Sequence, residues 1–296
     1  KFKPGTLTFA AGSDAWKKLK AEAAKTEGAY TIVIDGEIKA TGGDNAGEIT
    51  LGRNLTIKGK TGKASDILNA NKNEGGKSAH RIFKVASGKT LTLENLTLKG
   101  GIVDTYGEPG GGAIYAEGPL TMTDCTVTGN RIAANGGSSG GGICAVSTLT
   151  MTDCTVTDNR TEYGNGGGIY AAGALTMTSC TVSNNTVNDA DSLGGGGIYA
   201  GSTLTMTNCT IKNNEATSSS GGGIYARSTL TMTNCTVAEN TSKSSSSGAG
   251  SGGGIYAAGT LTMTGGAVTG NEAQSNGNGG GIYIGGAGSF TMTSGT

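Results

Sequence analysis

The feature that most constrains this chain is a pattern that recurs seven times between residue 114 and residue 296. Each copy opens on a glycine-rich run that is followed by Ile, as in GGGAIYA or GGGGIYA. In the first six copies Leu follows six residues later, Met two after that, Val or Ile five after Met, and Asn three further on. Phe290 and Met292 fill the Leu and Met places of the seventh copy, two residues late. The opening residues are Ile114, Ile143, Ile169, Ile198, Ile224, Ile255 and Ile282. A fixed period of this length indicates a solenoid, in which each repeat buries its apolar face against the next.

The repeats predict strands. Three short runs in each copy, GIYA, LTMT and CTV, alternate between apolar and polar residues and are rich in Thr, Val, Ile and Tyr, which is typical of strands and not of helices. The opening residues lie 26 to 31 residues apart, and the variation falls in one loop after Asn. Three strands per coil, each pairing with its counterpart one coil on at about 4.8 Å, predict an all-β, right-handed, single-stranded parallel β-helix of about nine coils.

Composition alone suggests a different class. Glycine contributes 56 of the 296 residues and aromatic side chains only 5%, which resembles a low-complexity disordered segment. The glycines are periodic, however, and periodicity outweighs composition in a repeat protein. Basic and acidic residues balance at 22 each. No apolar run approaches the roughly 20 residues of a membrane span, so we expect none in this stretch.

Residues 1–80 are predicted to form an N-terminal cap with a first irregular coil. The segment SDAWKKLKAEAAKTEG places Ser13 as the N-cap and Gly28 as the stop of a helix over about residues 14–27. Its apolar face covers the open end of the solenoid, where strand edges and core would otherwise be exposed. Residues 1–100 carry 17 basic residues against 10 acidic ones. Because the basic residues are dispersed and aromatics are few, we interpret this excess as a solvated cap and expect no nucleic-acid partner.

Residues 81–296 are predicted to form the regular β-helix. Its first coil is expected to place Val85, Leu91, Leu93, Leu96 and Leu98 in the Ile, Leu, Met, Cys and Val positions of the repeat. The sequence stops in the middle of a repeat and begins without a signal-like stretch. We therefore expect a fragment of a longer chain, truncated at its C-terminus.

Two columns of polar residues are predicted to face inward. Asn at the end of the third run can satisfy backbone groups at the bend and stack into an amide ladder; a row that binds a ligand is the alternative. Cys recurs three residues after Met on the inward side of five successive coils, where we expect stacked small apolar side chains without disulfides. Cys144 replaces a Tyr of the repeat and is expected to face outward as an exposed thiol. The predicted ladder is Asn130, Asn159, Asn185, Asn214, Asn240 and Asn271. The cysteine column is Cys125, Cys154, Cys180, Cys209 and Cys235.

Two outward columns are candidates for binding. The tyrosines that follow Ile in the GIYA-type runs can stack on one another, or provide an aromatic stripe for a sugar or protein partner. Thr-Met-Thr recurs in all seven copies, and its paired Thr columns resemble the ice-binding face of some β-helical antifreeze proteins, although Thr also suits any exposed strand. The tyrosine column is Tyr115, Tyr170, Tyr199, Tyr225, Tyr256 and Tyr283.

Catalysis has little support in the sequence. Polysaccharide-cleaving enzymes that use this fold need clustered carboxylates or bound calcium. Asp124 and Asp153 share one column, but Ser179, Asn208 and Asn234 continue it. That column is expected to be a turn position that accepts any small polar residue. The single histidine, His80, lies in the cap and is expected to be structural or solvated. We expect no enzyme activity, no cofactor and no metal site.

The repeats resemble a known family. GGAI at residues 111–114, GGGI in the later copies, and tetrapeptides such as VTGN at residues 127–130 are similar to the GGA[ILV] and FxxN repeats of chlamydial polymorphic outer-membrane proteins. Related repeats occur in surface proteins of other Gram-negative bacteria and spirochaetes. The resemblance covers about residues 82–296, with Val or Ile in place of Phe. It implies an exported β-helical passenger of the autotransporter kind, for which adhesion is the usual role.

These observations lead to one functional hypothesis and three alternatives. The hypothesis is a secreted or surface-exposed adhesin or stalk of a Gram-negative-type cell, whose partner is a protein or glycan on a host or neighbouring cell. Its loops at residues 131–141, 186–196, 241–252 and 272–280 are expected to meet that partner. The alternatives are a fibre subunit that associates end to end or laterally, a β-helix that binds or cleaves polysaccharide, and an ice-binding protein.

Overall fold

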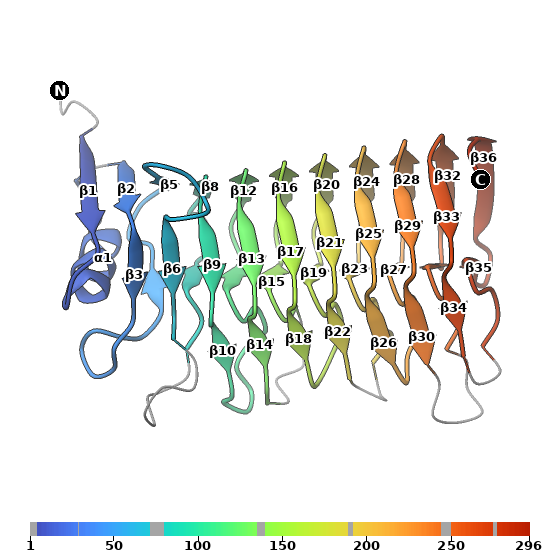
Figure 1. Cartoon of the computed structure of the whole chain (residues 1–296), viewed down its shortest axis with the longest axis horizontal. Helices are drawn as coiled ribbons and strands as arrows, with labels where there is room; N and C mark the ends of the chain where they lie inside the picture. The colour runs from blue at the N-terminus through green and yellow to red at the C-terminus, as the bar shows by residue number, and fades with distance from the viewer. Residues whose placement is uncertain are drawn as a thin grey trace.

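The protein forms one long coil of short strands. The structure is a computed structural model that describes residues 5–28, 30–71, 80–134, 140–188, 192–243, 250–274 and 277–296. The strands stack along the long axis, with the N-terminal helix at one end and the last strands at the other (Figure 1). Every pair of neighbouring strands in the sheets is parallel and joins equivalent positions, as in Ile169 beside Ile198 and Met177 beside Met206. The parallel β-helix predicted from the repeats is confirmed.

Four sheets run along the coil, and three of them are named after a residue that recurs in them. The tyrosine sheet consists of β4 (Ile49–Thr50), β7 (Phe83–Val85), β11 (Ile114–Ala116), β15 (Ile143–Ala145), β19 (Ile169–Ala171), β23 (Ile198–Ala200), β27 (Ile224–Ala226), β31 (Ile255–Ala257) and β35 (Ile282–Ile284). The methionine sheet consists of β1 (Thr6–Ala10), β2 (Thr31–Asp35), β5 (Leu55–Gly59), β8 (Leu91–Glu94), β12 (Leu120–Thr123), β16 (Leu149–Thr152), β20 (Leu175–Thr178), β24 (Leu204–Thr207), β28 (Leu230–Thr233), β32 (Thr260–Thr264) and β36 (Ser289–Ser294).

The other two sheets complete each coil. The valine sheet consists of β3 (Glu37–Lys39), β6 (Ile67–Asn69), β9 (Thr97–Lys99), β13 (Thr126–Thr128), β17 (Thr155–Thr157), β21 (Thr181–Ser183), β25 (Thr210–Lys212), β29 (Thr236–Ala238) and β33 (Ala267–Thr269). The fourth sheet consists of β10 (Ile102–Val103), β14 (Arg131–Ile132), β18 (Arg160–Thr161), β22 (Thr186–Val187), β26 (Glu215–Thr217), β30 (Thr241–Lys243) and β34 (Glu272–Ala273).

The fourth sheet corrects the prediction of three strands per coil. Its strands are two or three residues long and, from β14 on, begin directly after the Asn of the repeat, where the sequence pattern indicated only loop. The inward residue of this sheet changes type from coil to coil, so no constant apolar position marks it. From β14 to β30 the inward residues are all buried; they are Ile132, Thr161, Val187, Ala216 and Ser242. The loops predicted at residues 131–141, 186–196, 241–252 and 272–280 therefore each start with a strand. Parts of those loops lie outside the described residues.

The core is a set of buried ladders that run the length of the coil. The Ile, Leu, Met, Cys and Val columns are almost completely buried from the first regular coil to Met263. The register of the first coil differs from the prediction at one point: Phe83 pairs with Ile114, whereas Val85 pairs with Ala116. Phe83 therefore fills the Ile position, and Val85 the position two residues later.

A helix covers the N-terminal end, as predicted, but it is shorter. It is α1 (Ala15–Ala23), and its apolar residues Trp16, Leu19 and Ala23 are completely or almost completely buried. The N-cap is Asp14 and not Ser13, and its side chain forms no capping hydrogen bond. The buried guanidinium of Arg53 binds carbonyls at and just beyond the C-terminal end of the helix. Arg53 Nη1 donates to the carbonyl oxygens of Glu22 at 2.9 Å and Lys25 at 2.7 Å.

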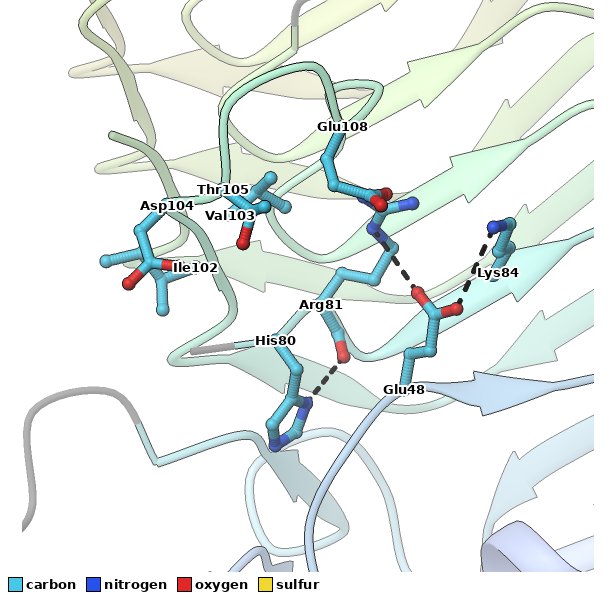
Figure 2. Close-up of a pocket in the computed structure, with 9 residues that line it drawn as sticks. All are labelled: Glu48, His80, Arg81, Lys84, Ile102, Val103, Asp104, Thr105 and Glu108. Carbon is cyan, nitrogen blue, oxygen red and sulfur yellow. Dashed lines mark hydrogen bonds and ion pairs between the residues drawn. The ribbon is translucent and has the colours of Figure 1, made fainter. Parts of the chain in front are cut away.

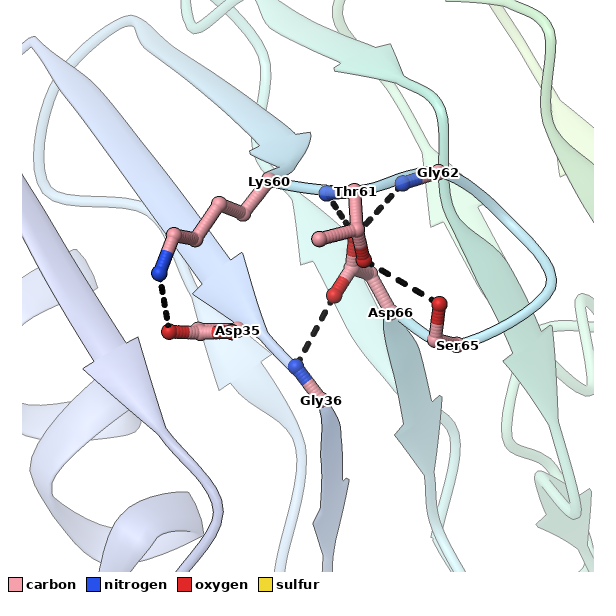
Figure 3. A network of polar contacts seen from close by, with 7 residues as sticks. All are labelled: Asp35, Gly36, Lys60, Thr61, Gly62, Ser65 and Asp66. Atoms are coloured by element: carbon pink, nitrogen blue, oxygen red, sulfur yellow. Dashed lines mark hydrogen bonds and ion pairs between the residues drawn. The ribbon is translucent and has the colours of Figure 1, made fainter.

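Ion pairs and a buried carboxylate join the first coils. The carboxylate of Glu48 lies 3.7 Å from Arg81 Nε and 3.9 Å from Lys84 Nζ (Figure 2). Further along the chain, the carboxylate of Asp66 is fully buried and accepts four hydrogen bonds (Figure 3). Its donors are the backbone N–H groups of Gly36 at 2.8 Å, Thr61 at 2.6 Å and Gly62 at 2.8 Å, and the Thr61 hydroxyl at 3.0 Å.

Asp66 is expected to make the stability of the cap depend on pH. Burial raises the pKa of Asp66, but the backbone hydrogen bonds outweigh burial, so its pKa lies below the ordinary value. A depressed pKa in the folded state stabilises the fold above the unfolded pKa of about 3.9, and this stabilisation is lost as pH falls through the folded pKa. Asp66→Asn should therefore lower the free energy of unfolding by about 2 kcal/mol at pH 7 and by less in acid. Denaturant unfolding of both proteins at pH 7 and at pH 3 measures this.

Asp44→Asn is the matched control, because Asp44 is exposed and forms its ion pair with exposed Lys17. An equal loss for Asp66→Asn at the two pH values would contradict the assignment of this carboxylate.

Candidate functional site: the loop edge

One edge of the coil holds the variation in length between repeats. From β11 to β30, the other three connections of each coil keep the same length, two or three residues. The connections from the fourth sheet to the tyrosine sheet differ from coil to coil, and we call them the loop edge. The fourth-sheet strands that precede them lie in a row along one side of the coil (Figure 1). These connections are residues 104–113, 133–142, 162–168, 188–197, 218–223, 244–254 and 274–281.

From the second connection on, each connection rejoins the coil through three glycines with different roles; in the first, Ala113 takes the third place. Gly195 has a φ of +76°, which is the left-handed region that favours glycine. A Cβ on Gly196 would lie 2.3 Å from the carbonyl oxygen of Gly222 in the next coil. A Cβ on Gly197 would lie 2.9 Å from the amide carbon of Asn214. The repeated GGGI motif therefore fixes the point where a loop of any length rejoins the tyrosine sheet.

The six asparagines that end the valine-sheet segments form an amide ladder beside those glycines. Asn185 Nδ2 donates to Asn214 Oδ1 at 3.0 Å, and Asn185 Oδ1 accepts from Asn159 Nδ2 at 3.0 Å. Asn185 Nδ2 also lies within hydrogen-bond distance of the backbone carbonyls of Val156 and Ser183. The same amide-to-amide link joins Asn130 to Asn159, Asn214 to Asn240, and Asn240 to Asn271. This ladder holds the bend that precedes every fourth-sheet strand.

Charged side chains gather on the outer surface of the fourth sheet. Glu162 Oε1 lies 2.9 Å from Arg131 Nη2 and 2.7 Å from Arg160 Nε. Burial raises the pKa of Glu162, but the hydrogen bond and charge of Arg160 outweigh it and leave the pKa below the ordinary value. Further along the coil, Lys243 Nζ lies 2.8 Å from Glu215 Oε1. This surface was not predicted from the sequence because its strands were not predicted. The alternation in RIA and EAT after Asn is the signal that marks these strands.

The predicted tyrosine column flanks the loop edge on the other side. Tyr170, Tyr199, Tyr225, Tyr256 and Tyr283 form a continuous stack with ring centroids 4.6 to 5.4 Å apart. Tyr199 and Tyr225 are buried, and the others are half-buried. Burial raises the pKa of Tyr225 to about 12, so its ring stays neutral. The rings therefore pack against one another, which accounts for the column by structure alone. Their role as a binding surface stays a prediction.

Cys144 is not the exposed thiol that the sequence predicted. It occupies the tyrosine column between Tyr115 and Tyr170, and it is completely buried. Its side chain is shorter than the tyrosine rings of the neighbouring coils, so those rings shield it. The five inward cysteines are buried as well, and the thiol of Cys180 donates to the carbonyl of Thr178 at 3.2 Å.

The column that contains Asp124 and Asp153 is a turn position, and its backbone conformation explains the residue types found there. Both residues have positive φ, +49° and +54°, and the column continues through Ser179, Asn208 and Asn234 with φ near the same value. Asp, Asn and Gly tolerate this left-handed conformation better than other residues. Asp124 also forms an ion pair with Lys63, at 2.5 Å between Oδ1 and Nζ.

His80 has a packing role in the cap. Its Nδ1 lies 2.7 Å from the carbonyl oxygen of Arg81, and its ring lies 5.4 Å from that of Trp16. Burial lowers the pKa of His80, so the ring is neutral near pH 7. In the part of the chain that the structure describes, no group of three or more His, Cys, Asp or Glu side chains could hold a metal ion.

Comparison with known proteins defines the class of this chain. A family model described as a right-handed β-helix region matches residues 64–241 and, in a second overlapping match, residues 164–296. These matches cover most of the chain, and the chain belongs to this family. No curated protein and no solved structure is significantly similar to it. Among the described residues, no helix is both long enough and apolar enough to cross a membrane.

Proposed function

We propose that this chain is an exported bacterial surface protein, in which a stable β-helix displays the loop edge to a partner on another cell. One observation carries the proposal: length varies at the loop edge, while the other connections and the sheet register stay constant over successive coils. A scaffold that keeps its geometry while one edge varies suits recognition, because loops on a rigid frame can change without loss of the fold.

The similarity of the repeats to chlamydial polymorphic outer-membrane proteins supports an exported passenger. The two motifs that carry this similarity, GGA[ILV] and FxxN, correspond here to the glycine columns and the asparagine ladder. Both motifs are needed for the bends of the coil that flank the loop edge. Arg131 and Arg160 of the fourth sheet and the tyrosine stack border this edge, and Arg and Tyr are enriched in protein contacts.

We also propose that the chain displays and does not catalyse. The carboxylates that share one column, Asp124 and Asp153, occupy left-handed turn positions that favour Asp, Asn or Gly for the backbone alone. The backbone conformation thus accounts for these carboxylates without a catalytic role. A screen of polysaccharide substrates in which cleavage disappears on Asp124→Asn and Asp153→Asn would contradict it.

Cell binding at the loop edge can be tested by reversing charges on the fourth-sheet strands that border it. Arg160→Glu with Lys243→Glu should reduce the binding of chain-coated beads to epithelial or bacterial cells by about tenfold or more. These side chains are exposed and their ion pairs contribute little to stability, so the fold should be retained. Flow cytometry of fluorescent beads measures the binding, and circular dichroism checks the fold.

Lys89→Glu with Lys212→Glu is the matched control. It makes the same change of charge on the turn before β8 and on β25, away from the loop edge. Equal losses in the two variants would show a general effect of charge and contradict the loop edge as the contact.

Protease treatment of intact producing cells tests export, since a chain that is cleaved only after lysis would contradict a surface location.

A further inference from the structure

A polar pocket lies at the N-terminal end of the loop edge. It forms where the first of the variable connections, residues 104–113, approaches the strands β7 and β10 (Figure 2). Its volume is about 230 Å³. No residue of this pocket was singled out as a binding residue from the sequence. The lining residues are Glu48, His80, Arg81, Lys84, Ile102, Val103, Asp104, Thr105 and Glu108.

Arg81 is the most unusual side chain in the pocket. It is 3% exposed, yet Nε and Nη1 have no hydrogen-bond acceptor among the described residues. Its Nη2 donates to the carbonyl oxygen of Pro109 at 2.9 Å and lies 3.4 Å from Glu108 Oε2, while Nε lies 3.7 Å from Glu48 Oε2. The ring of Tyr115 supports the guanidinium at 5.4 Å. Buried donors without acceptors are costly, so an acceptor that reached Nε or Nη1 through a small movement of Glu48 or Glu108 would be stabilised by them.

The charges around the pocket select against ionic ligands. Three carboxylates, of Glu48, Asp104 and Glu108, face two cations, Arg81 and Lys84, and His80 is neutral. An anionic ligand would meet the three carboxylates, and a cation would meet the buried guanidinium. A hydroxyl group donates one hydrogen bond and accepts others, so it can lie between a carboxylate and a guanidinium without adding charge.

We propose that this pocket binds a neutral saccharide unit. Vicinal hydroxyls would accept from Arg81 and Lys84 and donate to Glu48 and Glu108, while Ile102 and Val103 provide apolar contact for the C–H groups of the ring. A pocket of this volume accommodates one sugar ring. The inference rests on the proposed function only for its biological setting, in which the sugar would be the end of a glycan on the partner cell.

Binding can be measured directly on the purified chain. Saturation-transfer NMR and calorimetry with glucose, galactose, mannose, fucose and N-acetylglucosamine should identify at least one ligand with a dissociation constant on the order of 1 mM. N-acetylneuraminic acid, as an anion, and glycine, as a zwitterion, should bind at least about tenfold more weakly. Glu48→Gln should weaken binding about tenfold and Arg81→Met should abolish it.

The controls separate the pocket from its surroundings. Lys212→Met removes an exposed cation of β25, outside the pocket and the loop edge, and should leave sugar binding unchanged. Because Arg81 is buried and its replacement can disturb the fold, half-exposed Glu48 provides the second variant, and circular dichroism checks both. Absence of binding by every neutral sugar at tens of millimolar would overturn the proposal. Preference for the anion or the zwitterion, or unchanged binding in Glu48→Gln, would also overturn it. The bead assay is a separate readout, so failure of the pocket and failure of the proposed function are distinguishable.

Discussion

Asn185→Ala is expected to lower the free energy of unfolding by about 4 kcal/mol, because it breaks the amide ladder in its middle. The side chain of Asn185 is completely buried. Its removal leaves the carbonyls of Val156 and Ser183 without this donor, and the backbone N–H of Asn159 without the acceptor that now lies at 3.0 Å. Each buried group that loses its partner costs about 1–3 kcal/mol. Denaturant unfolding followed by circular dichroism measures the loss.

Asn188→Ala is the control for this prediction. Asn188 lies three residues later, and its amide donates to Glu162 Oε2 at 3.1 Å in a partly buried position at the loop edge. Its replacement should cost no more than about 0.5 kcal/mol. A loss below about 1 kcal/mol for Asn185→Ala would show that the ladder is not a main support of the coil.

Gly196→Ala is expected to cost about 3 kcal/mol or more, although it adds a single methyl group. The new Cβ would lie 2.3 Å from the carbonyl oxygen of Gly222 and 2.5 Å from the carbonyl group of Glu215. These are backbone atoms of neighbouring chain segments and cannot rotate away. The coils must separate locally, which weakens the hydrogen bond from Gly196 N–H to the carbonyl of Gly221 at 3.0 Å. The thermal unfolding midpoint should fall accordingly.

Gly201→Ala makes the same chemical change at a roomier position. The nearest atom to its Cβ would be the carbonyl oxygen of Ala171 at 3.4 Å, which is an ordinary contact. Its stability should stay within about 0.5 kcal/mol of the unchanged protein. If both glycine variants are equally stable, close approach between coils is not the reason for the second glycine of the motif.

Much of the fold was predictable because its inward residues repeat. The Leu and Met positions recur with one spacing in six coils, and each run alternates, so strand, direction and register follow from the pattern. The fourth sheet was not predicted because the residue at its inward position changes from Ile132 to Thr161 to Val187. The hydrogen bonds of the ladder and the three glycine positions explain how such variable strands are held in place.

The candidate sites were less predictable for a different reason. Alternation gives the side of a strand on which Cys144 lies, but its burial depends on the tyrosine rings of neighbouring coils. The pocket around Arg81 combines Glu48, Arg81 and Glu108 from separate segments of the chain, and no periodic signal connects them. Such a site becomes visible only when the coil brings these segments together.

The most direct measurement of the central claim shortens the loop edge and follows fold and binding in the same protein. The connections at residues 133–142, 188–197 and 244–254 would each be replaced by the native short connection SSSGGG of residues 218–223. Because the glycine columns and the ladder remain, the circular dichroism spectrum and the thermal midpoint should stay close to those of the full chain. Bead binding to cells should fall about tenfold or more. Retained binding, or loss of the fold, would contradict a stable β-helix that makes contact through its loop edge.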